Sequence, residues 1–246
     1  MIQKKEISLK DIPTYSIVNA ASSYLFLVSQ TTSYTCGPAA FASIVSNAPN
    51  DKEMEIASLV LGSLRPSVLL LGPSFLHLLS EMGFYDRILG LYYLASSEEI
   101  KINTLNEKIL EVMVKFENIP NNKEKKFKSG AKKTYETLFN RHKDKIIAIR
   151  NEDEFYEKFD KLICDPKIAI TALFFNEKSH IEELAVKGVL GTPHWMVPLG
   201  LTKDNYYIVY DPATNGIVWL TKDAVKQNFK KLPLIGLCPQ FLAIKK

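Results

Sequence analysis

The sequence predicts an α+β fold, in which a helical part over about residues 30–165 is followed by an antiparallel sheet over about residues 166–246. Two patterns indicate this division. Apolar residues recur at helical spacing in the first part, whereas the second part consists of short β-branched and aromatic runs separated by Gly, Pro, Asn and Asp. Because 46% of the 246 residues are hydrophobic, we expect a single domain with a substantial core.

The helix predictions rest on short start and stop signals. Cys36-Gly37-Pro38 leads into a small, apolar segment over residues 39–47, which favours a buried helix with Cys36 in its first turn. Asn151-Glu152-Asp153-Glu154 is typical of a capping box that opens a helix running to about residue 164. Further helices are expected over residues 52–61, 74–82, 105–116, 132–141 and 222–229.

The sheet is expected to contain strands over residues 167–175, 194–201, 206–210, 216–220 and 234–244. Lys203-Asp204-Asn205 is a good turn sequence between the second and third of these strands, so the two should pair antiparallel. Their pairing would bring Asp211, at the exit of one strand, level with His194, at the start of the other.

Positive charge is concentrated in one region. Between Lys101 and Lys145, 12 lysines and arginines face 6 acidic residues, whereas the rest of the chain is slightly acidic and the total formal charge is only +4. This Lys-rich elaboration, residues 101–145, is expected to be a solvated loop or helix surface, and an acidic partner or membrane surface is the alternative. Because the excess charge is regional, we expect no nucleic-acid binding.

Several functional classes are disfavoured by what the sequence lacks. It has no run of about 18 apolar residues and no secretory signal, so we expect no integral membrane segment and a cytoplasmic location, with export by a machine that recognises other signals as the alternative. Cys36, Cys164 and Cys238 are odd in number and far apart, which argues against a disulfide framework or a cysteine zinc site. No phosphate-binding loop or metal-ligand spacing is visible, so no cofactor is implied.

Cys36 has the sequence context of a nucleophile. A thiol attacks as its thiolate, and the unpaired N–H groups at a helix N-terminus stabilise that anion. Gly37 lets a substrate approach the backbone closely, and Pro38 lacks an N–H that the first helical turn would leave unpaired. Cys164 and Cys238, in contrast, are expected to be small buried residues.

A catalytic cysteine also needs a base, and only four histidines are present. His194 follows Gly191-Thr192-Pro193 and opens an apolar strand, so the sheet would hold it firmly at the mouth of a cleft. We expect His77 to be a core or helix-face residue, and His142 and His180 to lie on the surface. His194 is therefore the predicted base, with a purely structural histidine as the alternative.

Two further residues would complete a site. Asp211 can accept a hydrogen bond from His194 and fix its orientation, although it also fits the start of an Asp-Pro turn. Gln30, six residues before Cys36, can donate a side-chain N–H to an oxyanion beside the backbone N–H of Cys36.

Together these residues resemble a known family. Gln30, Cys36-Gly37-Pro38-Ala39-Ala40, His194 before an apolar strand and Tyr210-Asp211-Pro212 are similar to the papain-like cysteine peptidases, in particular to stand-alone relatives of the bacteriocin-processing, double-glycine leader peptidases. The resemblance covers about residues 29–47 and 191–216. It implies a papain-like fold, a peptide or protein substrate, Cys36 as nucleophile, His194 as base, Asp211 as orienting residue and Gln30 in the oxyanion hole.

The resemblance leaves the substrate and the reaction open. The leader peptidases are compact domains fused to transporters, whereas this chain has a long segment between Cys36 and the sheet motifs, so double-glycine specificity is not carried over. The leading hypothesis is a hydrolase, either a peptidase or an amidase, that forms an acyl-enzyme on Cys36. A phytochelatin-synthase-like acyl or dipeptidyl transferase would use the same residues, and a catalytically silent papain-like binding protein would keep only the fold.

Overall fold

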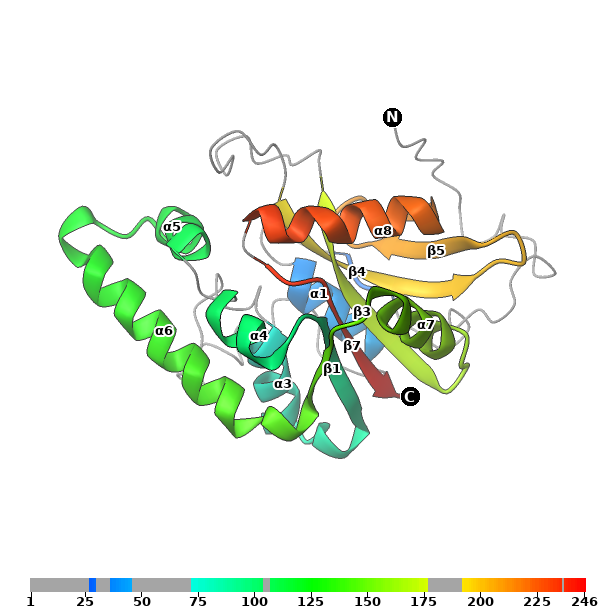
Figure 1. Ribbon diagram of the computed structural model, residues 1–246, viewed down its shortest axis with the longest axis horizontal. Helices are drawn as coiled ribbons and strands as arrows, with labels where there is room; N and C mark the ends of the chain where they lie inside the picture. Colours follow the sequence, from blue (N-terminus) through cyan, green and yellow to red (C-terminus); the bar gives the residue numbers. More distant parts are fainter. Residues whose placement is uncertain (1–26, 30–35, 46–71, 104–106, 177–191, 236) are drawn as a thin grey trace.

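The computed structural model describes residues 27–29, 36–45, 72–103, 107–176, 192–235 and 237–246 (Figure 1). These residues form an α+β fold around a seven-stranded mixed sheet, as the sequence predicts for the fold class. The strands are β1 (Ile88–Leu94), β2 (Ile146–Ile149), β3 (Ile168–Asn176), β4 (Thr192–Leu201), β5 (Tyr206–Asp211), β6 (Gly216–Thr221) and β7 (Gln240–Lys245). The helices are α1 (Cys36–Ile44), α3 (Gly72–Glu81), α4 (Ser97–Asn103), α5 (Glu107–Phe116), α6 (Glu124–Arg141), α7 (Glu152–Ile163) and α8 (Lys222–Lys231).

The strand order in the sheet is β2-β1-β7-β3-β4-β5-β6. Neighbouring strands are antiparallel throughout, except that β1 and β2 run parallel. The five strands predicted from the sequence are confirmed as β3 to β7. The last of them begins at Gln240 instead of residue 234, because the chain first forms a short 3-10 helix over Leu232–Ile235.

The prediction of a helical part followed by an antiparallel sheet missed β1 and β2, which lie within residues 30–165 and pair parallel. Strand β1 lies inside the sheet between β2 and β7 and is buried along most of its length. A strand covered on both faces is a nearly continuous apolar run, which lacks the alternation that identifies a half-exposed strand. Strand β2 is four residues long, which is too short to show a period.

Helices cover both faces of the sheet. In Figure 1, α7 and α8 lie in front of the strands, and α1 lies behind them. The front layer is packed by aromatic side chains that are fully buried, from α7, α8, β3 and β7: Phe155, Phe159, Phe174, Phe229 and Phe241. Burial of this much apolar surface is the main favourable term that holds the layers together.

Most predicted helices are confirmed, but α6 begins earlier than predicted and α4 is an additional helix. Helix α6 begins at Glu124, well before the predicted residue 132, so most of the lysine-rich segment after Lys123 is helical and one side of the helix is buried. Helix α4 was not expected from the sequence, and the predicted helix over residues 52–61 lies outside the described residues. The cap before α7 is confirmed, because the Asn151 side chain accepts hydrogen bonds from the backbone N–H groups of Asp153 and Glu154.

In the described part of the chain, no helix combines the length and the apolar character needed to cross a membrane.

Replacing Phe159 by alanine tests how far the front layer determines stability. Phe159 is buried and its ring meets those of Tyr207, Phe229 and Phe241. We expect Phe159→Ala to lower the free energy of unfolding by about 3–5 kcal/mol, because it removes a large side chain and leaves a cavity. Phe159→Leu, the matched control, should cost about 1–2 kcal/mol. Urea unfolding followed by circular dichroism measures both, and equal losses would contradict the cavity explanation.

Candidate active site

Cys36 is the first residue of α1, as the sequence predicts, and every residue of this helix is buried. The start of the helix is held tightly from one side. A Cβ atom on Gly37 would lie 2.4 Å from Cζ of Phe75, so only glycine fits there. The Phe75 ring stacks on Phe41 of α1 at a centroid distance of 3.6 Å, and both rings make T-shaped contacts with Trp195 in β4. These contacts fix the N-terminus of α1 against the strand that carries His194.

The described residues 27–29, which precede α1 in the sequence, are also attached to it. The backbone N–H of Val28 donates a 2.8 Å hydrogen bond to Oγ of Ser43, which in turn donates to the carbonyl oxygen of Ala39. Ser43 thereby satisfies its own hydroxyl inside a buried helix and anchors the neighbouring segment.

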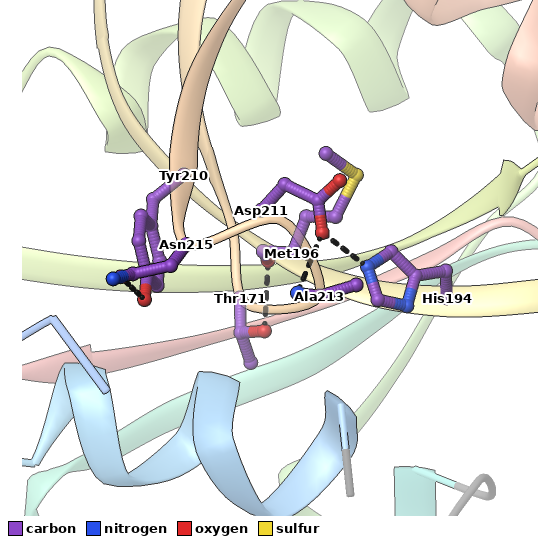
Figure 2. A network of polar contacts seen from close by, with 7 residues as sticks. All are labelled: Thr171, His194, Met196, Tyr210, Asp211, Ala213 and Asn215. Carbon is purple, nitrogen blue, oxygen red and sulfur yellow. Dashed lines mark hydrogen bonds and ion pairs between the residues drawn. The ribbon is translucent and has the colours of Figure 1, made fainter. Parts of the chain in front are cut away.

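His194 and Asp211 lie side by side at adjacent strand ends. The predicted hairpin pairs β4 with β5 antiparallel, with Val197 opposite Tyr210. Nε2 of His194 lies 2.6 Å from Oδ1 of Asp211, and both side chains are almost completely buried. Figure 2 shows the same carboxylate oxygen accepting a 2.9 Å hydrogen bond from the backbone N–H of Ala213. The expectation that Asp211 lies level with His194 is therefore confirmed.

Cys36 completes the cluster from the side of α1. Its thiolate accepts hydrogen bonds from the His194 side chain and from the backbone N–H groups of Trp195 and Gly37. Because Asp211 occupies Nε2 of His194, the ring atom left for Cys36 is Nδ1. The structure thus brings together three of the four predicted site residues.

The electrostatics of this pair favour charge separation. Burial raises the pKa of the Cys36 thiol, but the positive charge and the hydrogen bond of His194, with the two backbone N–H groups, lower the pKa below its ordinary value. Burial lowers the pKa of His194, but the Cys36 thiolate and the Asp211 carboxylate raise the pKa to about 10. Both shifts favour a thiolate on Cys36 and an imidazolium on His194 over the two neutral groups.

The fourth predicted residue, Gln30, lies outside the described residues, and its role stays a prediction. One contributor was missed by sequence reasoning, namely the backbone N–H of Trp195 that donates to Cys36. Because every residue except proline carries an N–H group, no sequence signal identifies this donor.

Of the other three histidines, His77 and His142 lie in the described residues, and their predicted burial can be compared with the structure. His77 is buried, as expected. The prediction that His142 lies on the surface is wrong, because its side chain is 2% exposed and Nε2 lies 3.5 Å from Nδ1 of His77. Burial, together with the charges of His77 and Arg141, lowers the pKa of His142 to about 4. The last turn of α6 packs against α3, and His142 follows that turn into the contact. His180 lies outside the described residues.

The other cysteines lack the features that activate Cys36. Cys238 is buried as predicted, and burial together with the charge of Glu99 raises its pKa to about 11. Cys164 is only half-buried, which differs from the prediction, and burial followed by the charge of Asp160 raises its pKa.

The Lys-rich elaboration forms a groove along α6 with a cavity of about 770 Å³. Four lysines line it, Lys125, Lys128, Lys132 and Lys133, but three glutamates line it as well. Glu107 of α5 accepts hydrogen bonds from Lys128 at 3.1 Å and Lys132 at 3.2 Å. The charge in the groove is therefore nearly balanced, and an acidic partner stays a prediction.

No known protein-family model matches the chain, and none of the curated proteins is significantly similar to it in sequence. Within the described ranges, no group of three or more His, Cys, Asp and Glu side chains is arranged to hold a metal ion. The functional argument therefore depends on the geometry around Cys36.

Alkylation tests the charge state of Cys36. At pH 7, iodoacetamide should modify Cys36 faster than Cys164 or Cys238, because only the Cys36 thiol has a lowered pKa. The rate at Cys36 should fall as the pH is lowered through this pKa, where the thiolate takes up a proton. Peptide mapping by mass spectrometry gives the three rates. Similar slow rates at all three cysteines would contradict the ion pair.

Replacing Asp211 tests its hold on His194. Asp211→Asn removes a negative charge that raises the pKa of His194, so the imidazolium should lose its proton at a lower pH than in the wild type, where the pKa is about 10. Anionic iodoacetate is attracted by the imidazolium and neutral iodoacetamide is not, so the ratio of their rates at Cys36 reports this charge. As the pH is raised, the ratio should fall when His194 loses its proton, and in Asp211→Asn this fall should occur at a lower pH than in the wild type. An unchanged profile would mean that Asp211 does not influence His194.

Proposed function

We propose that this protein is a cysteine hydrolase, a peptidase or amidase with a papain-like fold, that acts through the thiolate of Cys36. The observation that carries the proposal is the buried arrangement in which Cys36 contacts His194 and His194 contacts Asp211 at 2.6 Å. A buried charged pair costs desolvation energy and is a weak way to gain stability. Shifted pKa values at contacting nucleophilic and basic groups are instead typical of a catalytic site.

The proposed reaction begins with attack of the Cys36 thiolate on the carbonyl carbon of an amide or peptide bond. The π electrons of the carbonyl group move to oxygen, and the oxyanion is stabilised by the backbone N–H of Cys36 and, as the sequence predicts, by the side chain of Gln30. When the tetrahedral intermediate collapses, the C–N bond breaks. The His194 imidazolium gives its proton to the leaving amine, and an acyl-enzyme remains on Cys36.

Water completes the cycle. The imidazole of His194, now neutral, takes a proton from a water molecule, whose oxygen attacks the thioester carbon. The C–S bond then breaks, the acid is released, and the thiolate–imidazolium pair is restored. Asp211 keeps Nε2 of His194 occupied throughout, so Nδ1 faces the reacting atoms in both half-reactions.

The papain-like assignment is supported by where the reacting groups stand. A cysteine begins a buried helix that packs on the sheet, and the histidine and the carboxylate stand at the ends of neighbouring antiparallel strands. A phytochelatin-synthase-like transferase would use the same three residues and differs only in the group that accepts the acyl chain. A peptide or protein substrate and a cytoplasmic location stay predictions.

A cleavage profile of wild type against Cys36→Ala tests the proposal. Incubated with a proteome-derived peptide library, the wild type should generate new peptide ends that Cys36→Ala does not, and His194→Ala should lower turnover by roughly 10²- to 10⁴-fold. Labelled amines added to the reaction separate hydrolysis from transfer, because a transferase attaches them to the products. Identical profiles for wild type and Cys36→Ala, in proteins with the same circular dichroism spectrum, would overturn the proposal.

A further inference from the structure

Tyr210 is a buried residue beside the candidate site, at the end of the strand that carries Asp211. It directly precedes Asp211 at the end of β5, and its side chain is 2% exposed. The hydroxyl group donates a 2.9 Å hydrogen bond to Oδ1 of Asn215, the last residue before β6 (Figure 2). The two ends of the turn that follows Asp211 are thus joined through a buried side chain.

The same hydroxyl reaches a third segment. Ser29 hydrogen-bonds to the Tyr210 side chain and favours its ionised form, although burial keeps the pKa of Tyr210 above its ordinary value. Ser29 follows Val28, which is attached to α1 through Ser43. Tyr210 therefore connects the segment that leads toward Cys36 with the turn that leads away from Asp211.

The turn over residues 212–215 is constrained at both of its ends. Near its start, Oδ1 of Asp211 accepts the backbone N–H of Ala213. At its end, Asn215 has a φ of 49°, in the left-handed region that asparagine tolerates better than most residues. The hydrogen bond from Tyr210 to the Asn215 side chain therefore ties the end of the turn back to the last part of β5.

We propose that Tyr210 is a positioning residue of the Cys36 site: its hydroxyl, by joining Ser29 to Asn215, holds the turn that aims the Asp211 carboxylate at His194. This inference rests on the proposed function. The 2.6 Å contact between Asp211 and His194 is short and charge-assisted, and such contacts weaken when the carboxylate moves by a few tenths of an ångström. The titratable neighbours that shift His194 are Cys36 from α1 and Asp211 from β5, and Tyr210 acts only through the second.

The test uses Tyr210→Phe, which removes the hydroxyl and keeps the ring. The rate ratio of iodoacetate to iodoacetamide at Cys36 is measured against pH, because this ratio follows the imidazolium charge of His194. We expect the fall of the ratio to occur at lower pH than in wild type, in the direction of Asp211→Asn but with a smaller displacement. Turnover of any peptide substrate found by cleavage profiling should drop about three- to tenfold, as for the loss of one hydrogen bond.

Asn215 supplies a second, independent variant. Asn215→Gly removes the acceptor and keeps a residue that accepts positive φ, so it should displace the pH profile in the same direction as Tyr210→Phe, by the same amount or less because the hydrogen bond to Ser29 is kept. The double variant should then be no worse than Tyr210→Phe alone, because that substitution already removes the hydrogen bond to Asn215. Asn215→Asp keeps an acceptor oxygen and should not lower the pH at which the ratio falls. Tyr206→Phe, which removes a hydroxyl from the exposed end of the same strand, is the matched control and should behave as wild type.

The outcomes separate this inference from the function on which it rests. If wild-type Cys36 shows no selective alkylation, the proposed function fails, and the role of Tyr210 fails with it. If the wild type shows selective alkylation but folded Tyr210→Phe and Asn215→Gly keep its pH profile, only the positioning role is overturned. Displaced profiles in both variants, with additive effects in the double variant, would also overturn it, since the two side chains would then act separately.

Discussion

The site depends on one packing cluster more than on any other, the three rings of Phe41, Phe75 and Trp195, through which α1, α3 and β4 meet. Phe75 meets Phe41, Trp195 and the bare Cα of Gly37, so the start of α1 has a single position relative to the strand that carries His194. Protein interiors are packed closely enough that a small displacement here has no free volume to absorb it. Because Cys36 and His194 belong to two of the elements that this cluster joins, apolar packing sets the distance between two polar groups.

Cys36 and His194 are buried, so their charged forms lose the stabilisation that water would give. Neighbouring groups of the protein replace much of it. Cys36 and His194 are 4% and 6% exposed, so water screens them poorly. A helix N-terminus, two backbone N–H groups and the mutual attraction of the charges favour the thiolate, and Asp211 favours the imidazolium. Removal of one member leaves an uncompensated charge in a low-dielectric interior, so the group behaves as a unit and not as a sum of separate residues.

Much of this arrangement was predictable because its causes are local. The turn at Lys203-Asp204-Asn205 and the apolar, β-branched and aromatic runs on either side of it predicted the hairpin that aligns His194 with Asp211, and Cys36-Gly37-Pro38 predicted the start of α1. Long-range causes were missed: the buried β1, and His142, whose surroundings come from α3, far away in sequence. Helix α4 shows a further limit, since Ser96 and Glu99 do form the reciprocal hydrogen bonds of a capping box, in a segment whose apolar pattern is too short to be noticed.

The position of β7 has a consequence for how the chain reaches this state. Although β7 comes last in the sequence among the described strands, it lies in the middle of the sheet, between β1 and β3. Until residues Gln240–Lys245 have been synthesised, the β1–β2 pair and the β3–β6 meander have no strand to join them. A nascent chain can therefore build the hairpin of His194 and Asp211 early, yet the seven-stranded sheet closes only after β7 has paired with both β1 and β3.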